Sequence, residues 1–224
     1  MLVTIEIDGE ESTFIYKENI LEKSKYNKLK KWLEHQDYIN GNCVSGKPIP
    51  RQQLWFQEEG KYFCDEWKYK YERWMSNEYT EVLKEVQRII NVETIKLLKE
   101  TEYEVPPFNS ILVNKYRDGN DSIKPHKDCP QSFGVYPIIS VLSIGDTRDI
   151  NIKRVIYNED NLASLREYKN TDYNFILPLK DNSLFIMAGA SQKYFTHEIP
   201  KCISNEIRYS LTFRDHKTEK SGKV

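Results

Sequence analysis

Short apolar segments, separated by polar residues and by Gly, Pro, Asn and Asp, make up the second half of the chain. These segments are rich in β-branched and aromatic residues, which is typical of β-strands. We expect strands at residues 112–116, 137–144, 149–156, 173–179, 183–187, 195–199 and 208–213. Many short strands joined by turns predict a sandwich, a barrel or a jelly roll.

The first half has a different pattern. Residues 2–9 alternate between apolar and polar side chains and end at a glycine, which predicts one strand. In the basic run 23–31 and just beyond it, Tyr26, Leu29 and Leu33 have helical spacing, so we expect a surface helix with a solvated lysine face.

The presence or absence of Gly and Pro distinguishes two further segments. Residues 41–50 contain two glycines and two prolines and are expected to form a loop. Residues 78–100 contain neither, and their apolar positions form one stripe, so they predict one amphipathic helix or two in succession. The polar residues 158–172 are expected to be an insertion between two strands.

Composition limits the choice of function. The net charge of −1 provides no overall attraction to nucleic acid, so a nucleic-acid substrate would need a local basic patch. Residues 1–11 are acidic and have no long apolar run, so we expect no secretory leader, and the sequence contains no apolar run of about 18 residues. Its four cysteines form no CxxC pair. We therefore expect an intracellular protein, in cytoplasm or nucleus, with reduced thiols and no membrane partner. The sequence does not predict the oligomeric state.

Candidate metal ligands are His126, Asp128 and His197. On an extended segment His126 and Asp128 share a face, and an opposite strand could return His197 to the same point. Two imidazoles and one carboxylate make the facial triad of non-heme Fe(II) oxygenases, which leaves positions open for a co-substrate and dioxygen. The alternative is that His-x-Asp is accidental and that His197 is a structural histidine.

Segment 208–214 alternates strictly, so Arg208 and Arg214 share a strand face. If that face were solvated, the segment would be an ordinary edge strand. If it faces inward, the two guanidinium groups need anionic partners, and each can hold a carboxylate. A dicarboxylate such as 2-oxoglutarate fits this arrangement, and Asn114 and Tyr116 could complete the same pocket.

Taken together, these motifs resemble the AlkB family of nucleic-acid dealkylating dioxygenases from about residue 50 to residue 214. The motifs that carry the resemblance follow in family order: 108–119, His126-Lys127-Asp128, 137–145, Thr147-Arg148, 183–190, His197 and 208–214. The resemblance implies an α+β, mainly β fold, with a double-stranded β-helix (jelly roll) core, N-terminal helices and a substrate lid.

The resemblance also implies domain limits and site residues. The oxygenase domain would span 46–216, with a lid at about 46–76 and the jelly-roll core at about 108–216. Residues 1–45 would be an unassigned extension and 217–224 a polar tail. Fe(II) would be bound by His126, Asp128 and His197. The co-substrate 2-oxoglutarate would be bound by Asn114, Tyr116, Arg208, Ser210 and Arg214.

Substrate contacts are expected from the lid and from the residue after the Asp ligand. They are Arg51, Trp55, Tyr69, Tyr71 and Cys129, although any one lid ring could merely pack on the core. Many nucleic-acid-repairing members carry an acidic residue where this chain has Cys129, so the preferred base stays open. The arginine strand also carries Ser210 in place of the usual Asn.

The implied function is oxidative demethylation of N-alkylated bases, such as 1-methyladenine or 3-methylcytosine, in DNA or RNA. It would use Fe(II), O2 and 2-oxoglutarate and release succinate, carbon dioxide and formaldehyde. One alternative is the same chemistry on a protein or a small molecule. A further alternative is a non-catalytic nucleic-acid-binding module.

Overall fold

The computed structural model describes residues 1–42, 46–63, 74–161, 164–169 and 172–217. Its strands are β1 (Leu2–Ile7), β2 (Glu10–Lys17), β3 (Ile39–Asn42), β4 (Pro48–Gln57), β5 (Ser110–Tyr116), β6 (Ile123–His126), β7 (Ile139–Gly145), β8 (Arg148–Arg154), β9 (Phe175–Leu179), β10 (Ser183–Gly189), β11 (Phe195–Ile199) and β12 (Arg208–Arg214). Its helices are α1 (Lys23–Glu34), α2 (Glu81–Leu98), α3 (Pro130–Phe133) and α4 (Ser191–Tyr194). None of the described helices is both long and apolar enough to cross a membrane.

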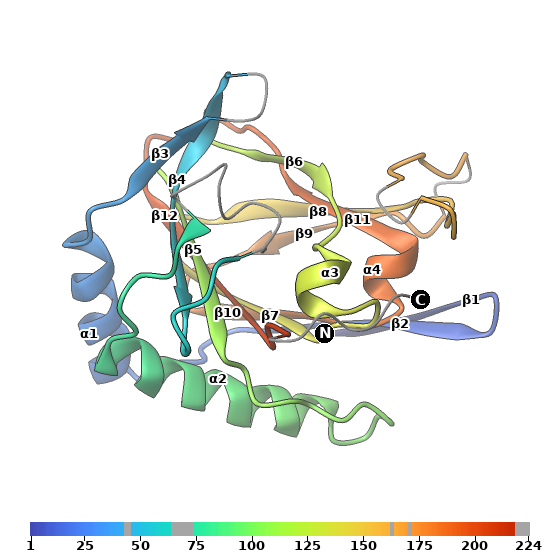
Figure 1. Cartoon of the computed structure of the whole chain (residues 1–224), viewed down its shortest axis with the longest axis horizontal. Coiled ribbons are helices and arrows are strands. Elements are labelled where there is room, and N and C mark those ends of the chain that lie inside the picture. Colours follow the sequence, from blue (N-terminus) through green and yellow to red (C-terminus); the bar gives the residue numbers. More distant parts are fainter. Residues whose placement is uncertain (43–45, 64–73, 162–163, 170–171, 218–224) are drawn as a thin grey trace.

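Two antiparallel sheets form the core. The major sheet has the order β1-β2-β10-β7-β12-β5-β4-β3, and the minor sheet has the order β6-β11-β8-β9. Figure 1 shows α1 and α2 outside the major sheet, on the side away from the minor sheet. One apolar cluster joins these helices to the major sheet, and a second includes residues from both sheets. This is the mainly β, jelly-roll architecture that was expected.

Strict alternation along β12 determines which side chains enter the site. Tyr209, Leu211 and Phe213 belong to the cluster that the helices cover. Arg208 and Arg214 therefore point to the opposite side, toward the minor sheet, and both are buried. Each fully buried apolar side chain stabilises the fold by about 1.5–3 kcal/mol, so reversing the strand's faces would be very costly.

The strand expectations for the second half are confirmed, with ends that agree within two residues. The strand at 2–9 and both expected helices are also present, as β1, α1 and α2. The expected loop at 41–50 is wrong at both ends, because β3 reaches Asn42 and β4 begins at Pro48. The stretch 158–172 does lie between β8 and β9.

The interpretation of residues 1–45 as an extension outside the domain is wrong. The N-terminal hairpin, which comprises β1 and β2, belongs to the major sheet, where β2 pairs with β10. Phe14 of β2 is completely buried and packs against Phe185 and Phe195. The hairpin thus completes the hydrophobic core, which sequence patterning could not reveal because its strand partner lies about 170 residues away in the chain.

The expected lid at about 46–76 also needs correction. Residues 48–57 are strand β4 of the major sheet, paired with β5 through contacts such as Gln53 with Asn114. Residues 64–73, which include Tyr69 and Tyr71, lie outside the described residues. Most of the expected tail, 218–224, lies outside them as well.

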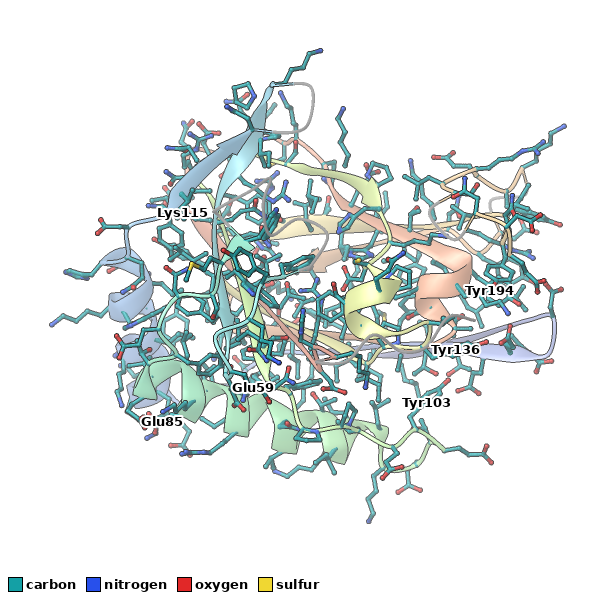
Figure 2. The ribbon with its side chains drawn as sticks, in the orientation of Figure 1. Glu59, Glu85, Tyr103, Lys115, Tyr136 and Tyr194 are labelled. Carbon is teal, nitrogen blue, oxygen red and sulfur yellow. The ribbon has the colours of Figure 1, made fainter. Side chains whose placement is uncertain are left out.

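Glu10, at the turn of the N-terminal hairpin, binds α4. Its carboxylate accepts hydrogen bonds from Lys193, Tyr136 and Tyr194. In Figure 2, Tyr136 and Tyr194 lie near each other at the edge of the molecule beside α4. Hydrogen bonds from Lys193 and the two phenols lower the pKa of Glu10 from 4.5 to about 2.

We predict that this contact makes stability depend on pH in the acid range. A carboxyl whose pKa is lowered by folding contributes stability above its unfolded pKa, and that contribution is lost as the pH falls toward its folded pKa. The stability advantage of the wild type over Glu10→Gln should be constant above about pH 5 and should disappear between about pH 4.5 and 2. Urea unfolding at several pH values measures it, and a difference that does not change with pH would contradict the prediction.

Candidate metal and dicarboxylate site

The paired strands β6 and β11 bring the three candidate metal ligands together. His126 at the end of β6 lies directly opposite His197 on β11, and their ring centroids are 4.1 Å apart. Asp128 follows β6, and one of its carboxylate oxygens lies 3.9 Å from Nε2 of His197. One possible ligand atom from each residue falls within 4.8 Å of the others. The three side chains can therefore share one ion.

Protonation of the two histidines also suits a metal. Burial lowers the pKa of His197 to about 3 and lowers the pKa of His126 as well. Both imidazoles are therefore neutral near pH 7 and have lone pairs available. Burial alone would raise the pKa of Asp128, but attraction by Arg214 and then by His197 holds it below its usual range. The site presents two neutral nitrogen ligands and one anionic oxygen ligand.

Arg214 forms a two-point ion pair with Asp128. Its Nε and Nη2 atoms donate to the two carboxylate oxygens at 2.5 and 3.0 Å. The remaining Nη1 is buried and has no hydrogen-bond partner among the described residues. The guanidinium thus orients the carboxylate and retains one donor for another group.

Arg208 has far fewer partners. Its Nη2 donates to the hydroxyl of Ser143 at 2.8 Å, whereas Nε and Nη1 are buried without a hydrogen-bond partner in the described structure. The guanidinium carbon lies 5.1 Å from the centre of the Tyr116 ring. Burial lowers the pKa of Arg208, yet an arginine remains charged, so this group needs an anion.

The two arginines line the same cavity as the candidate metal ligands His126 and His197. The cavity lies between the inner faces of the two sheets, and it holds about 440 Å³ of space not filled by atoms, which includes space open to solvent. Besides the two histidines and two arginines, its walls include Asn114, Tyr116 and Ser210, together with apolar side chains of both sheets. Every residue expected to bind 2-oxoglutarate therefore lies on this one cavity.

Asn114 connects the cavity to strand β4. Its side-chain oxygen accepts hydrogen bonds from Nε of Arg51 at 2.9 Å and from Gln53 at 3.0 Å. Its nitrogen lies 3.5 Å from the hydroxyl of Ser210. Arg51, which was expected to contact substrate, thus reaches the cavity wall and also donates to the carbonyl of Ser122.

Trp55 and Cys129 differ from Arg51. Trp55 is 0% exposed, its indole nitrogen donates to the carbonyl of Lys61, and its ring packs on Phe63. The expectation that Trp55 stacks on a base is therefore not supported, because no face of the ring is open in this structure. Cys129 is half-buried beside the same aromatic cluster and lies against Gln131.

Two residues near the site, His216 and Gln192, are not predicted from the sequence. His216 is buried between Trp55 and Phe133 and hydrogen-bonds the carbonyl of Phe63. Its spacing from Arg214, two residues, was the available signal. Gln192 accepts a hydrogen bond from the backbone N–H of Asp128, and no local pattern indicates a contact across 64 residues.

The comparisons with known proteins agree with this geometry. Residues 13–214 match the model of the 2OG-Fe(II) oxygenase superfamily. Over 112 residues the chain is 38% identical to alpha-ketoglutarate-dependent dioxygenase alkB homolog 3 of Rattus norvegicus, which covers 48% of this chain and 35% of that protein. Over 134 residues it is 31% identical to DNA oxidative demethylase ALKBH2 of Arabidopsis thaliana, covering 54% of this chain and 42% of that protein. The matched segments therefore span less than half of either relative.

The structure of OsALKBH1 has the same fold. Its TM-score is 0.56 at 16% sequence identity, and the alignment covers 90% of this chain and 97% of that one. At this level of identity the likeness concerns the jelly roll alone.

We predict opposite effects on stability for the two arginines of β12. Arg208→Met removes a buried cation that forms no ion pair within the described part of the chain, so the ligand-free protein should become more stable by about 1–4 kcal/mol. Arg214→Met leaves Asp128 buried without its partner and should destabilise by about 3–5 kcal/mol. Urea unfolding of the metal-free, ligand-free proteins measures both, and losses of equal size would contradict the prediction.

Proposed function

The chain belongs to the 2OG-Fe(II) oxygenase superfamily, and on that basis we propose that it oxidatively demethylates N-alkylated bases in DNA or RNA. The main support is that His126 and His197 line the same cavity as two buried arginines, and that Asp128 offers a third ligand atom within 4.8 Å of the histidines. The name of one relative, a DNA oxidative demethylase, points to nucleic acid as the substrate, and the name of the other, an alpha-ketoglutarate-dependent dioxygenase, points to the same chemistry.

The residues present fit the group that the family name implies. His126, Asp128 and His197 would hold Fe(II), since two nitrogens and one carboxylate oxygen are the donor set of a facial triad. When bound together, Fe(II) and 2-oxoglutarate enable dioxygen to oxidise a substrate C–H bond, with release of succinate and carbon dioxide.

Arg208 and Arg214 would each bind one carboxylate of 2-oxoglutarate. The two buried, unpartnered nitrogens of Arg208 can donate to the carboxylate far from the metal, with Tyr116 beside them. The free Nη1 of Arg214 and the side chain of Asn114 can then orient the carboxylate at the metal end. A dicarboxylate would thus neutralise the buried positive charge that the strand brings into the core.

The substrate would enter beside β4 and the chain that follows β6. Arg51 of β4 reaches the cavity wall through Asn114 and has the charge that a phosphate or a base edge needs. A base must leave the stack to reach the cavity, which costs a few kcal/mol and least for a lesion that cannot pair. Loss of the methyl group as formaldehyde would then restore the base.

Because Trp55 is buried, a second candidate function is the same oxidation on a protein side chain or a small molecule. Without that ring, the described part of the expected lid offers less aromatic surface for stacking a base. A non-catalytic nucleic-acid-binding module is the third reading. It is disfavoured because a binding scaffold has no need for two buried guanidinium groups beside a complete triad.

We expect the decisive result from anaerobic loading with Fe(II) and 2-oxoglutarate, followed by oxygen and a methylated oligonucleotide. Succinate and demethylated base should form together in the wild type and fall below detection in His126→Ala. His35→Ala is the matched control, because His35 caps the C-terminal end of α1 and does not line the cavity, and its turnover should equal that of the wild type.

Other outcomes separate the rival functions. Succinate without demethylation would leave a dioxygenase whose substrate is a protein or a small molecule. Full turnover in His126→Ala would contradict the metal assignment. No binding of Fe(II) or 2-oxoglutarate would favour the non-catalytic module.

A further inference from the structure

The short helix α4 lies in the chain between β10 and β11, and β11 carries the candidate ligand His197. It follows the turn at Gly189, whose φ of +62° and whose close approach to the carbonyl of Glu11 exclude a side chain. Three residues after α4 ends, the chain reaches His197. Any group that holds α4 therefore also restricts the strand that carries one of the metal ligands.

Gln192 of α4 contacts a second ligand directly. Its side-chain oxygen accepts a hydrogen bond from the backbone N–H of Asp128 at 2.9 Å. Because that N–H can only donate, the amide oxygen rather than the nitrogen must face it. The amide nitrogen lies 3.5 Å from the sulfur of Met187, and the side chain is buried. Gln192 is thus held on both sides.

Asp128 needs such a partner because it lies past the end of a strand. The pairing of β6 with β11 ends at His126, so no strand neighbour receives the N–H of Asp128. Its carboxylate is meanwhile drawn toward Arg214. The bond from Gln192 fixes the backbone while Arg214 fixes the side chain, and together they set the direction of the carboxylate.

The N-terminal hairpin holds α4 from the other side. Glu10 accepts hydrogen bonds from Lys193 and Tyr194, the two residues that follow Gln192. The next residue of the hairpin, Glu11, instead receives the hydroxyl groups of Thr13 and Tyr103. Only one of these two adjacent carboxylates therefore contacts α4.

We propose that Gln192 is a positioning residue for the metal ligand Asp128, and that the N-terminal hairpin supports it through Glu10. This inference rests on the proposed metal site. It assigns a role in the site to residues 1–17, which the sequence left without one. Outer partners of metal ligands change metal affinity by about 10- to 100-fold when they are removed, and this is the size of effect that we expect for Gln192.

The test is anaerobic titration of the full chain with Co(II), followed by the visible absorption of the bound ion. Gln192→Met keeps the length of the side chain and removes the carbonyl, so Co(II) should bind about 10- to 100-fold more weakly. Gln192→Glu retains an acceptor oxygen and should bind Co(II) more tightly than Gln192→Met. Glu10→Ala should weaken binding by up to about tenfold, and Glu11→Ala should not.

A structural role alone would give a different pattern. The melting temperature of each metal-free variant is measured in parallel, since Glu10→Ala and Glu11→Ala both lose hydrogen bonds of the hairpin. If Co(II) affinity follows melting temperature across all variants, or is unchanged in Gln192→Met, the inference is wrong and the metal site stands. If the wild type does not bind Co(II), the proposed metal site itself fails. If Gln192→Met does not fold, the comparison of Glu10→Ala with Glu11→Ala decides.

Discussion

The buried ion pair between Arg214 and Asp128 is the interaction on which the site depends. Arg214 ends β12 in the major sheet, and Asp128 follows β6 in the minor sheet, so their two-point contact joins the two sheets. An unpaired charge at either position would be costly in the core. The pair therefore restrains the separation of the sheets, the direction of the Asp128 carboxylate and the width of the cavity at that point.

From this pair the rest of the site extends in two directions. Along β12, alternation places Arg208 on the same side as Arg214. Two buried nitrogens of Arg208 have no hydrogen-bond partner among the described residues and can bind an anion. Across the minor sheet, pairing of β6 with β11 brings His197 opposite His126. The site thus combines a metal-binding set of two neutral nitrogens and one carboxylate oxygen with a cationic end at Arg208.

Much of this site could be anticipated. The alternation in 208–214, the His-x-Asp pair and the late His197 are local patterns, and side-chain direction follows directly from strand periodicity. The predictions that are wrong depend on contacts between residues far apart in the chain. The N-terminal hairpin appeared to be an extension because its partner β10 lies far along the chain. The prediction that Trp55 stacks on a base fails because the burial of Trp55 depends on neighbours outside its own segment.

By itself the sequence determined strands β1, β5 and β7 to β12, the faces of β5 and β12, and which residues could serve as metal and carboxylate ligands, because these depend on periodicity and on the chemistry of each residue. Only the tertiary structure decided that Asp128 is held by Arg214 and Gln192, that Glu10 holds α4, and that Trp55 is closed to solvent. Each of these depends on groups that are distant in the chain and meet only when the two sheets pack, and no local pattern encodes their distances.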